Sequence, residues 1–189
     1  GGFIICANHV SKIDFLFISL ALSKERYMKL CCMAKKELFR NDPFSRKLIK
    51  SAGMVPVDRG GMNSSSMENI KKRLKENWGV IIHPEGTRSE AGVFRKIKNG
   101  ASTLAIETGA PIIPAYVDGA YNIFPKSGKM PKFYDWKHHK KFRLSVTFGK
   151  PISPDGLTTE ELTAEIERAI SVLQDENSTL PQFQSHSAE

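Results

Sequence analysis

The chain has 189 residues, of which 40% are hydrophobic, and this is enough apolar material for one ordinary core and one compact domain. Lys and Arg outnumber Asp and Glu by 28 to 20, and the formal net charge of +8 favours anionic partners: nucleic acid, phosphorylated metabolites or an acidic membrane face. The longest apolar run, residues 15–22, is shorter than the ~18–20 residues that a membrane-spanning helix requires, so no such helix is expected.

Short apolar runs alternate along the chain with longer segments of helical periodicity. Strands are expected at residues 3–7, 28–34, 54–58, 79–83, 111–117 and 142–149, the last of them a candidate for antiparallel pairing. Helices are expected at residues 11–22, 43–53, 64–77, 100–109 and 158–176, with Thr158 and Glu161 as the capping box of the last one. This order predicts an α/β fold with a mostly parallel central sheet flanked by helices.

Domain organisation and cysteine usage are simple. We expect a single domain over residues 1–176 and a disordered tail over residues 177–189, and we also expect further sequence upstream of Gly1, because the chain enters a strand at once. Cys6, Cys31 and Cys32 lie in apolar surroundings without a C-x-x-C pair. They are expected to be buried thiols in a reducing compartment.

His9 and Asp14 stand where the first strand gives way to a helical pattern. Ser11-x-x-Asp14 matches a variant of the capping box, and on that interpretation Ser11 caps the helix and His9 is only a loop residue. The same arrangement lets His9 fold back over the first turn, so that Asp14 accepts one ring proton and the other ring nitrogen serves as a base for a substrate hydroxyl. The two interpretations are compatible.

A protein nucleophile does not accompany this pair. The sequence has no G-x-S-x-G motif, and Cys6 belongs to an expected buried strand. A base without a protein nucleophile favours attack by the substrate's own hydroxyl group.

Four sequence blocks, in order and in register, resemble the glycerolipid acyltransferases, especially the 1-acyl-glycerol-3-phosphate acyltransferases. They are NHVSKID (8–14), GMVPVDRGG (53–61), HPEGTRS (83–89) and APIIPAYV (110–117), and the resemblance covers residues 2–151. The third block departs from the family, which usually has phenylalanine where this chain has His83. The resemblance implies a glycerolipid acyltransferase-like fold, with His9 as the base and Asp14 as its orienting carboxylate.

The resemblance also implies a phosphate site. Arg59 and Arg88 would hold the phosphate of the acceptor, with Glu85, Gly86 and Thr87 shaping the pocket. The residue types suit this role, because arginine binds phosphate with a planar fork of donors and glycine allows close backbone approach. The alternatives are a solvated turn arginine for Arg59 and an internal ion pair with an arginine for Glu85.

Two basic segments have several interpretations. Arg95, Lys96 and Lys98 precede an expected helix, where they would bind phosphate or the diphosphate of coenzyme A, or form a solvated loop; Lys98 is kept as a candidate substrate-binding residue. Residues 129–143 interleave aromatic and basic side chains, which suits an anionic bilayer, single-stranded nucleic acid or a plain charged loop. His138 and His139 lack spaced Cys or His partners, so no metal is expected.

The implied activity is transfer of a fatty acyl group from acyl-CoA or acyl-acyl carrier protein to the 2-hydroxyl of 1-acyl-glycerol 3-phosphate, giving phosphatidic acid for phospholipid biosynthesis. No metal or redox cofactor is required. The expected partners are the lysophospholipid, the acyl thioester donor, with acyl carrier protein as one option, and an anionic membrane surface. The protein would work at the cytoplasmic face of the membrane, peripherally or anchored by upstream sequence.

Two alternatives to this activity remain open: the same chemistry with another acceptor, and a protein of another functional class. The acceptor would instead be glycerol 3-phosphate or another lysophospholipid, because the same blocks serve those members of the family. A basic module that binds membranes or nucleic acid is the alternative from another class. It leaves the polar residues at the strand exits, such as His9 and Glu85, without a role, so nucleic acid is not an expected partner.

Overall fold

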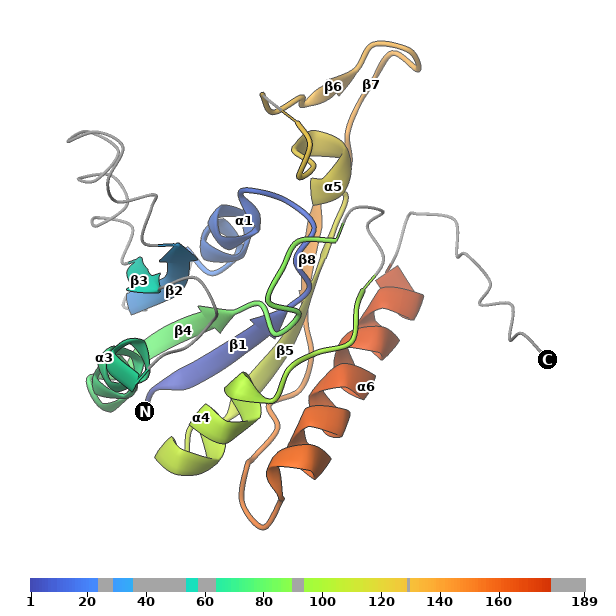
Figure 1. The fold of residues 1–189 in the computed structure, drawn as a ribbon. Coiled ribbons are helices and arrows are strands. Elements are labelled where there is room, and N and C mark those ends of the chain that lie inside the picture. Colours follow the sequence, from blue (N-terminus) through green and yellow to red (C-terminus); the bar gives the residue numbers. More distant parts are fainter. Residues whose placement is uncertain (24–28, 36–53, 58–63, 90–93, 129, 178–189) are drawn as a thin grey trace.

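The fold is built on a six-stranded sheet in the computed structural model, which describes residues 1–23, 29–35, 54–57, 64–89, 94–128 and 130–177. The strands are β1 (Phe3–Ala7), β2 (Lys29–Lys35), β3 (Val55–Val57), β4 (Trp78–Ile82), β5 (Ile112–Asp118) and β8 (Ser145–Phe148). They lie in the order β3-β2-β4-β1-β5-β8, and all neighbouring pairs are parallel except the antiparallel pair of β5 and β8 (Figure 1). The predicted mostly parallel α/β sheet is therefore confirmed.

Helices cover both faces of this sheet (Figure 1). They are α1 (Asp14–Ala21), α3 (Ser64–Lys75), α4 (Gly100–Thr108), α5 (Ala120–Ile123) and α6 (Thr159–Asn177). Successive side chains of a strand point to opposite faces, so Ile4 and Cys6 of β1 join the core beneath α3, α4 and α6, whereas Ile5 and Ala7 join the core beneath α1 and α5. The central strand is thus buried on both sides, as is usual for parallel sheets.

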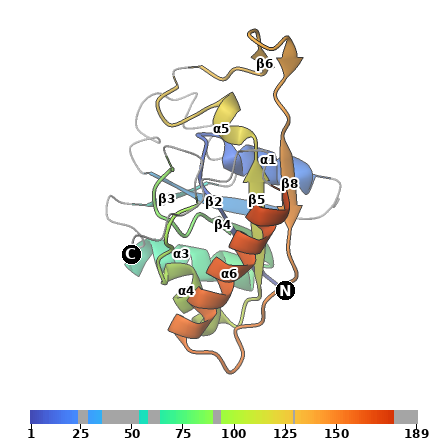
Figure 2. The same cartoon turned by 90° about the vertical axis from the view of Figure 1, so that its right-hand side faces the viewer.

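A short two-stranded ribbon stands apart from the main sheet. Its strands β6 (Tyr134–Asp135) and β7 (Lys140–Lys141) pair antiparallel with each other and with no other strand of the described residues. Two views at right angles show the ribbon projecting beyond α5, at the end of the molecule opposite the N-terminus (Figures 1 and 2).

One expected helix start is wrong. The helix predicted from Ser11 begins at Asp14, and its N-cap position, Ile13, makes no side-chain capping bond. The Ser11 hydroxyl donates to the Phe124 carbonyl (2.9 Å) and accepts from the Ile13 amide (3.3 Å), so it does not cap the helix. A long-range contact therefore competes successfully with the local capping motif.

Most other boundaries agree with expectation to within a few residues. The Thr158 and Glu161 capping box is present: the Thr158 amide donates to Glu161 Oε2 (2.9 Å), and the Glu161 amide donates to Thr158 Oγ1 (3.2 Å). Asn177, placed in the expected tail, is the last residue of α6. The helix expected at residues 43–53 and the rest of the tail, residues 178–189, lie outside the described residues.

The structure bears on two further predictions, which concern membrane-spanning helices and the burial of the cysteines. None of the helices in the described residues combines the length and apolar character needed to cross a bilayer. The three cysteines are free and buried, as expected, and burial raises the pKa of Cys6 to about 12. Cys6 is therefore a neutral thiol at physiological pH and is unsuited to nucleophilic attack.

Candidate active site

The candidate site is centred on the segment from Asn8 to Asp14, here called the His9 turn, which leaves the carboxyl end of β1 and leads into α1. Asp14 organises this turn, because its Oδ2 accepts hydrogen bonds from His9 Nδ1 (2.8 Å) and from the backbone amides of Val10 and Ser11 (2.9 Å each). The predicted contact between His9 and Asp14 is therefore present. It connects two side chains that would point away from each other if both lay on one continuous helix.

The two members of this pair differ in exposure. The Asp14 side chain is fully buried, and 24% of the His9 side chain is exposed. Burial raises the pKa of Asp14 to about 6, against the opposing effects of His83, the two backbone amides and Arg88. Because the ionised carboxylate only accepts hydrogen bonds, Nδ1 of His9 donates to it and Nε2 keeps its lone pair. This tautomer of the part-exposed imidazole is the one that a general base requires.

Asn8 anchors the beginning of the His9 turn to the neighbouring strand. Its side-chain amide donates to the Val117 carbonyl (3.0 Å), and its Oδ1 accepts from the Val117 amide (2.7 Å). Asn8 is 1% exposed, so both of its polar groups are satisfied inside the protein. The carboxyl ends of β1 and β5 are therefore held in a fixed relation just before His9.

The segment that follows β4 clamps the backbone of His9 from the other side. Glu85 Oε1 accepts from the His9 amide (2.7 Å), and the Ser89 amide donates to the His9 carbonyl (2.7 Å). The second Glu85 oxygen accepts from the Arg95 amide (3.1 Å). Glu85 was predicted to shape the substrate pocket; the structure shows a buried carboxylate engaged by backbone donors, which braces the His9 turn.

Burial dominates the electrostatics of Glu85. It raises the pKa of this carboxyl to about 7, although the hydrogen bonds from the His9 and Arg95 amides act in the opposite direction. The negative charge of Asp14 contributes to the increase. When ionised, this carboxyl group would repel a phosphate brought close to it, and its part in shaping the substrate pocket stays a prediction.

The predicted phosphate-binding residues that follow Glu85 face outward. Gly86 and Thr87 are exposed and Arg88 is half-buried. The Arg88 guanidinium makes no hydrogen bond or ion pair with the residues that the structure describes, and it lies close enough to lower the pKa of Asp14. Arg88 thus stands near the His9–Asp14 pair without a partner among the described residues, and its role in phosphate binding remains a prediction.

Lys98 is brought to the same place from further along the chain. Its backbone amide donates to the Pro84 carbonyl (2.9 Å), and a Cβ built on Gly86 would lie 3.4 Å from its Nζ. Gly86 has a φ of 71°, in the left-handed region that favours glycine. Lys98 therefore lies beside the exposed Gly86, which precedes Arg88 by two residues in the sequence. Arg59, the other predicted phosphate ligand, lies outside the described residues.

His83 is a site residue whose position the sequence did not reveal. Its ring stacks on that of His9, with centroids 4.1 Å apart and an interplanar angle of 10°. Its Nδ1 lies 3.1 Å from the Ala7 carbonyl and 3.0 Å from the Asn8 carbonyl, so this nitrogen carries the proton of the neutral ring. Burial and then His9 lower the pKa of His83 to about 4. A neutral ring therefore covers one face of His9.

His9, Asp14 and His83 each place one potential metal ligand within 4.8 Å of the others. The arrangement nevertheless suits a metal poorly. The lone pairs of two nearly parallel, stacked rings lie in the ring planes and do not converge on one point. His83 Nδ1 faces two carbonyl groups, and Asp14 Oδ2 already accepts three hydrogen bonds.

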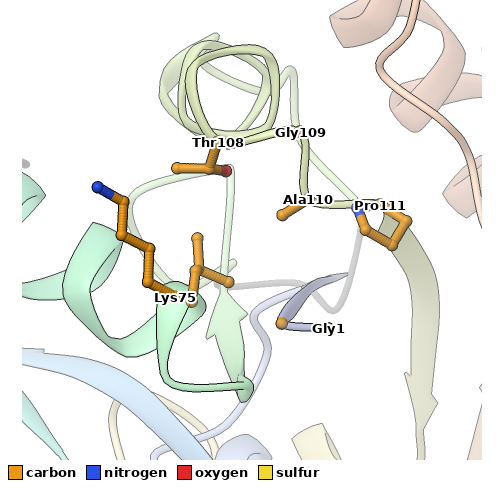
Figure 3. Close-up of a pocket in the computed structure, with 8 residues that line it drawn as sticks. Gly1, Lys75, Thr108, Gly109, Ala110 and Pro111 are labelled. Carbon is orange, nitrogen blue, oxygen red and sulfur yellow. The ribbon is translucent and has the colours of Figure 1, made fainter.

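A small pocket lies elsewhere on the molecule and contains none of these residues (Figure 3). Its lining includes Gly1, Gly2, Lys75, Thr108 and Pro111, at the amino ends of β1 and β5. The Thr108 hydroxyl donates to the Leu104 carbonyl within α4. The candidate site lies at the carboxyl ends of the same strands, where α/β sheets bind their ligands.

The contacts of Asn8 and His83 were not predicted from the sequence, for different reasons. Asn8 was noted only as part of a motif, although a buried polar residue directly after a strand is a signal for a structural hydrogen bond. The stacking of His83 on His9 joins positions on two separate strands, so no local pattern could reveal it. A part-exposed imidazole that is oriented by a buried carboxylate, at the carboxyl end of a strand in an α/β sheet, is an arrangement typical of enzymes that use a general base.

Comparison with known proteins makes this assignment specific. The profile of the Acyltransferase family matches residues 1–118, which span β1 to β5 and include the His9 turn and the segment after β4. The chain belongs to this acyltransferase family. The resemblance drawn from the four sequence blocks is therefore confirmed.

Several curated relatives are named 1-acyl-sn-glycerol-3-phosphate acyltransferase. The chain is 32% identical to the 1-acyl-sn-glycerol-3-phosphate acyltransferase of Bacillus subtilis, over 80% of this chain and 67% of the relative. It is 30% identical to the human 1-acyl-sn-glycerol-3-phosphate acyltransferase beta, over 87% of this chain and 55% of the relative. The chain thus spans between about half and two thirds of the length of these curated relatives.

A solved structure agrees with the fold. The crystal structure of the 1-acyl-sn-glycerophosphate (LPA) acyltransferase PlsC from Thermotoga maritima superimposes with a TM-score of 0.69 at 27% identity. The match covers 93% of this chain and 66% of that chain.

Proposed function

We propose that this protein transfers a fatty acyl group from an acyl thioester to the 2-hydroxyl of 1-acyl-glycerol 3-phosphate, giving phosphatidic acid for phospholipid biosynthesis. The donor is acyl-CoA or acyl-acyl carrier protein. The observation that carries the proposal is the hydrogen bond between His9 Nδ1 and the buried Asp14 carboxylate (2.8 Å), which leaves Nε2 of a part-exposed imidazole as a base. The names of the relatives support the choice of acceptor.

The reaction follows from the positions of the side chains. Nε2 of His9 accepts the proton of the acceptor hydroxyl while the hydroxyl oxygen attacks the thioester carbonyl carbon. The new C–O bond forms, the C–S bond breaks, and the imidazolium returns its proton to the departing thiolate, so that a free thiol leaves. Asp14 holds the ring orientation and stabilises the imidazolium, in the way that an aspartate supports the histidine of a catalytic triad. The reaction as written needs no metal or redox cofactor.

Arg88 and Lys98 supply the phosphate-binding side of the site in this proposal, together with Arg59. A phosphate held by a bidentate arginine would orient the acceptor, and orientation can supply much of the acceleration of a bimolecular reaction. The clamped backbone of His9 supports the same view, because a base fixed by Glu85 and Ser89 loses little freedom when the acceptor binds.

We also infer that the protein works at the cytoplasmic face of a membrane. Both the acceptor and the product of the proposed reaction are membrane lipids. The net charge of +8 favours an anionic lipid surface over a neutral one.

Release of free thiol from a radiolabelled acyl thioester, with and without lysophosphatidic acid, tests the proposal. We expect thiol release only when the acceptor is present, together with labelled phosphatidic acid. His9→Ala should lower turnover by about 10²–10⁴-fold, the usual contribution of a general base, and should keep the circular dichroism spectrum of the folded protein. Near-full turnover by the alanine variant would show that His9 is not the base.

A panel of acceptors separates this activity from its alternatives. Glycerol 3-phosphate and lysophospholipids with larger head groups would be offered with the same labelled donor. Preferred use of one of them over lysophosphatidic acid would replace the proposed acceptor but keep the catalytic residues.

A further inference from the structure

We propose that the β6–β7 segment docks the protein on an anionic lipid bilayer through a surface called here the hairpin face. Its members are the apolar side chains Met130, Phe133 and Trp136 and the basic side chains Lys132, Lys137, Lys140, Lys141 and Arg143. The inference rests on the proposed function for the identity of the membrane substrate. It goes further by naming the part of the molecule that meets the membrane.

The apolar side chains of the hairpin face are unusually exposed. Met130 is 74% exposed, Phe133 59% and Trp136 79%, although residues of these types are normally buried. The rings of Tyr134 and Trp136 pack edge to face, with centroids 4.8 Å apart, so the exposed indole is in contact with a neighbouring ring. Neighbouring exposed apolar groups mark interaction sites, and tryptophan in particular favours the head-group level of a bilayer.

The charge of the segment complements anionic lipid. Residues 130–143 contain five Lys or Arg and a single acidic residue, Asp135. Asp135 is already engaged: its carboxylate accepts from His138 Nδ1 (2.7 Å) and from the backbone amides of Lys137 and His138. None of the five cations forms an ion pair with a residue that the structure describes. They remain available to lipid phosphates at the surface.

The base of the hairpin is bonded directly to the His9 turn. The Phe124 carbonyl, at the end of α5, accepts from the Ser11 hydroxyl (2.9 Å) and from the Lys12 amide (3.3 Å). Lys12 Nζ donates to the Gly128 carbonyl and lies 4.8 Å from the centre of the Phe124 ring. The Lys132 amide then donates to the Ile123 carbonyl (2.8 Å). A bilayer that binds the hairpin face would therefore have a defined position relative to the catalytic base.

The overall arrangement places the hairpin face at the functional end of the molecule. Figures 1 and 2 show the hairpin extending beyond α5, away from the amino ends of β1 and β5. The adjoining helix α1 exposes Leu16 and Leu20, one helical turn apart. Aliphatic side chains such as these and Met130 insert into lipid but do not stack on bases, so the observations favour a bilayer over nucleic acid.

Flotation with lipid vesicles tests the docking surface. Wild-type protein should float with vesicles of phosphatidylglycerol and phosphatidylcholine, should float less with pure phosphatidylcholine, and should lose binding as salt is raised. The double variant Phe133→Ser/Trp136→Ser and the double variant Lys140→Glu/Lys141→Glu should each lower the partition coefficient at least tenfold. Val172→Ser is the matched control, because Val172 is 48% exposed on α6, and it should bind as wild type does.

Tryptophan fluorescence adds a direct readout. The chain has two tryptophans, Trp78 and Trp136, so the Trp78→Phe variant reports on Trp136 alone. Its emission should shift to shorter wavelength with anionic vesicles and should be quenched by brominated lipid. Unchanged emission, or unchanged flotation of both hairpin variants, would overturn the proposal. Loss of oligonucleotide binding by these variants while vesicle binding persists would overturn it in favour of nucleic acid.

The test is separable from that of the proposed function. The hairpin variants should retain turnover with a short-chain lysophosphatidic acid that is monomeric in solution. Wild-type protein that binds vesicles through the hairpin face but releases no thiol would contradict the proposed acyl transfer and would still support the docking surface. If wild-type protein turns over and the hairpin variants bind vesicles as well as wild type does, the result would support the proposed acyl transfer and contradict the docking surface.

Discussion

Two histidine–carboxylate pairs of nearly the same geometry occur among the described residues, in very different surroundings. His9 Nδ1 lies 2.8 Å from Asp14 Oδ2 beside the main sheet, and His138 Nδ1 lies 2.7 Å from Asp135 Oδ2 in the hairpin. The carboxyl pKa values move in opposite directions, because burial raises that of Asp14 to about 6, whereas the hydrogen bond from His138 lowers that of Asp135. A short contact alone therefore does not make a catalytic pair.

The surroundings explain the difference. Asp14 also holds two backbone amides of the His9 turn, and His9 itself is clamped by Glu85 and covered by His83. His138 has 57% of its side chain exposed, and no ring of the described residues stacks on it. Water can replace each contact of the exposed pair at little cost, whereas the buried pair is held in one arrangement.

Replacement of the two aspartates is the strongest test of this comparison. Asp14→Asn should lower kcat by about 10²–10⁴-fold, because the amide cannot stabilise the imidazolium that forms on His9. Asp135→Asn, assayed with a monomeric acceptor in solution, should leave kcat within about twofold of wild type, since exposed pairs contribute little. Equal loss of turnover by both variants would contradict the distinction drawn here.

Arg88 marks a further difference, because a cation without a described partner stands beside the buried pair. Arg88→Ala should raise the KM for lysophosphatidic acid by about 10–100-fold, as expected for loss of a charge-assisted bidentate contact, with a smaller change in kcat. Steady-state kinetics at several acceptor concentrations would measure both constants. Arg168→Ala, an exposed residue of α6, serves as the control. An unchanged KM would remove Arg88 from the phosphate site.

Replacement of Glu85 tests whether the hydrogen bond to the His9 amide contributes to turnover. In Glu85→Gln, one of the backbone amides of His9 and Arg95 loses its carboxylate acceptor and meets an amide donor. We expect kcat to fall by about tenfold, the equivalent of roughly 1.4 kcal/mol, with the acceptor KM unchanged. A higher KM with normal kcat would instead place Glu85 in contact with the substrate. Glu160→Gln, on the first turn of α6, is the matched control.

Replacement of His83 is expected to have the smallest effect on turnover of the changes considered. Its main effect is expected on the pH dependence of the free energy of unfolding. The unfolded chain protonates His83 near its ordinary pKa of 6.5, whereas the folded protein does so only near pH 4. Between these values the unfolded state binds more protons, so this residue costs the fold stability as the pH falls. By pH 4.5 the wild type should lose about 2 kcal/mol more than His83→Phe, measured by urea unfolding. A parallel pH dependence of the two proteins would contradict the lowered pKa of His83 in the folded protein.

The sequence predicted the fold better than it predicted the connections within the site. Alternating short apolar runs and helical segments sufficed for the parallel sheet, because the buried strands have few other interpretations. The His9–Asp14 contact was also predictable, since both residues lie in one turn. Local spacing was enough for that hydrogen bond.

Contacts between distant segments were not predictable in the same way. The Ser11 hydroxyl was expected to cap α1 and instead binds Phe124, which is 113 residues away along the chain. The hydrogen bond from the His9 amide to Glu85 was not expected, and nothing near His83 in the sequence indicated that it would stack on His9. Each of these contacts depends on the order of strands in the sheet, which a local motif does not contain.

The long reach of the contacts that hold the His9 turn has a consequence for biosynthesis. His9 and its neighbours depend on partners 76, 109 and 113 residues further along the chain. On a ribosome, the histidine is made early, but its supports arrive only after most of the sheet has been translated. Catalytic competence should therefore appear late and all at once, so that enzymatic activity in a translation reaction would report completion of the folded sheet.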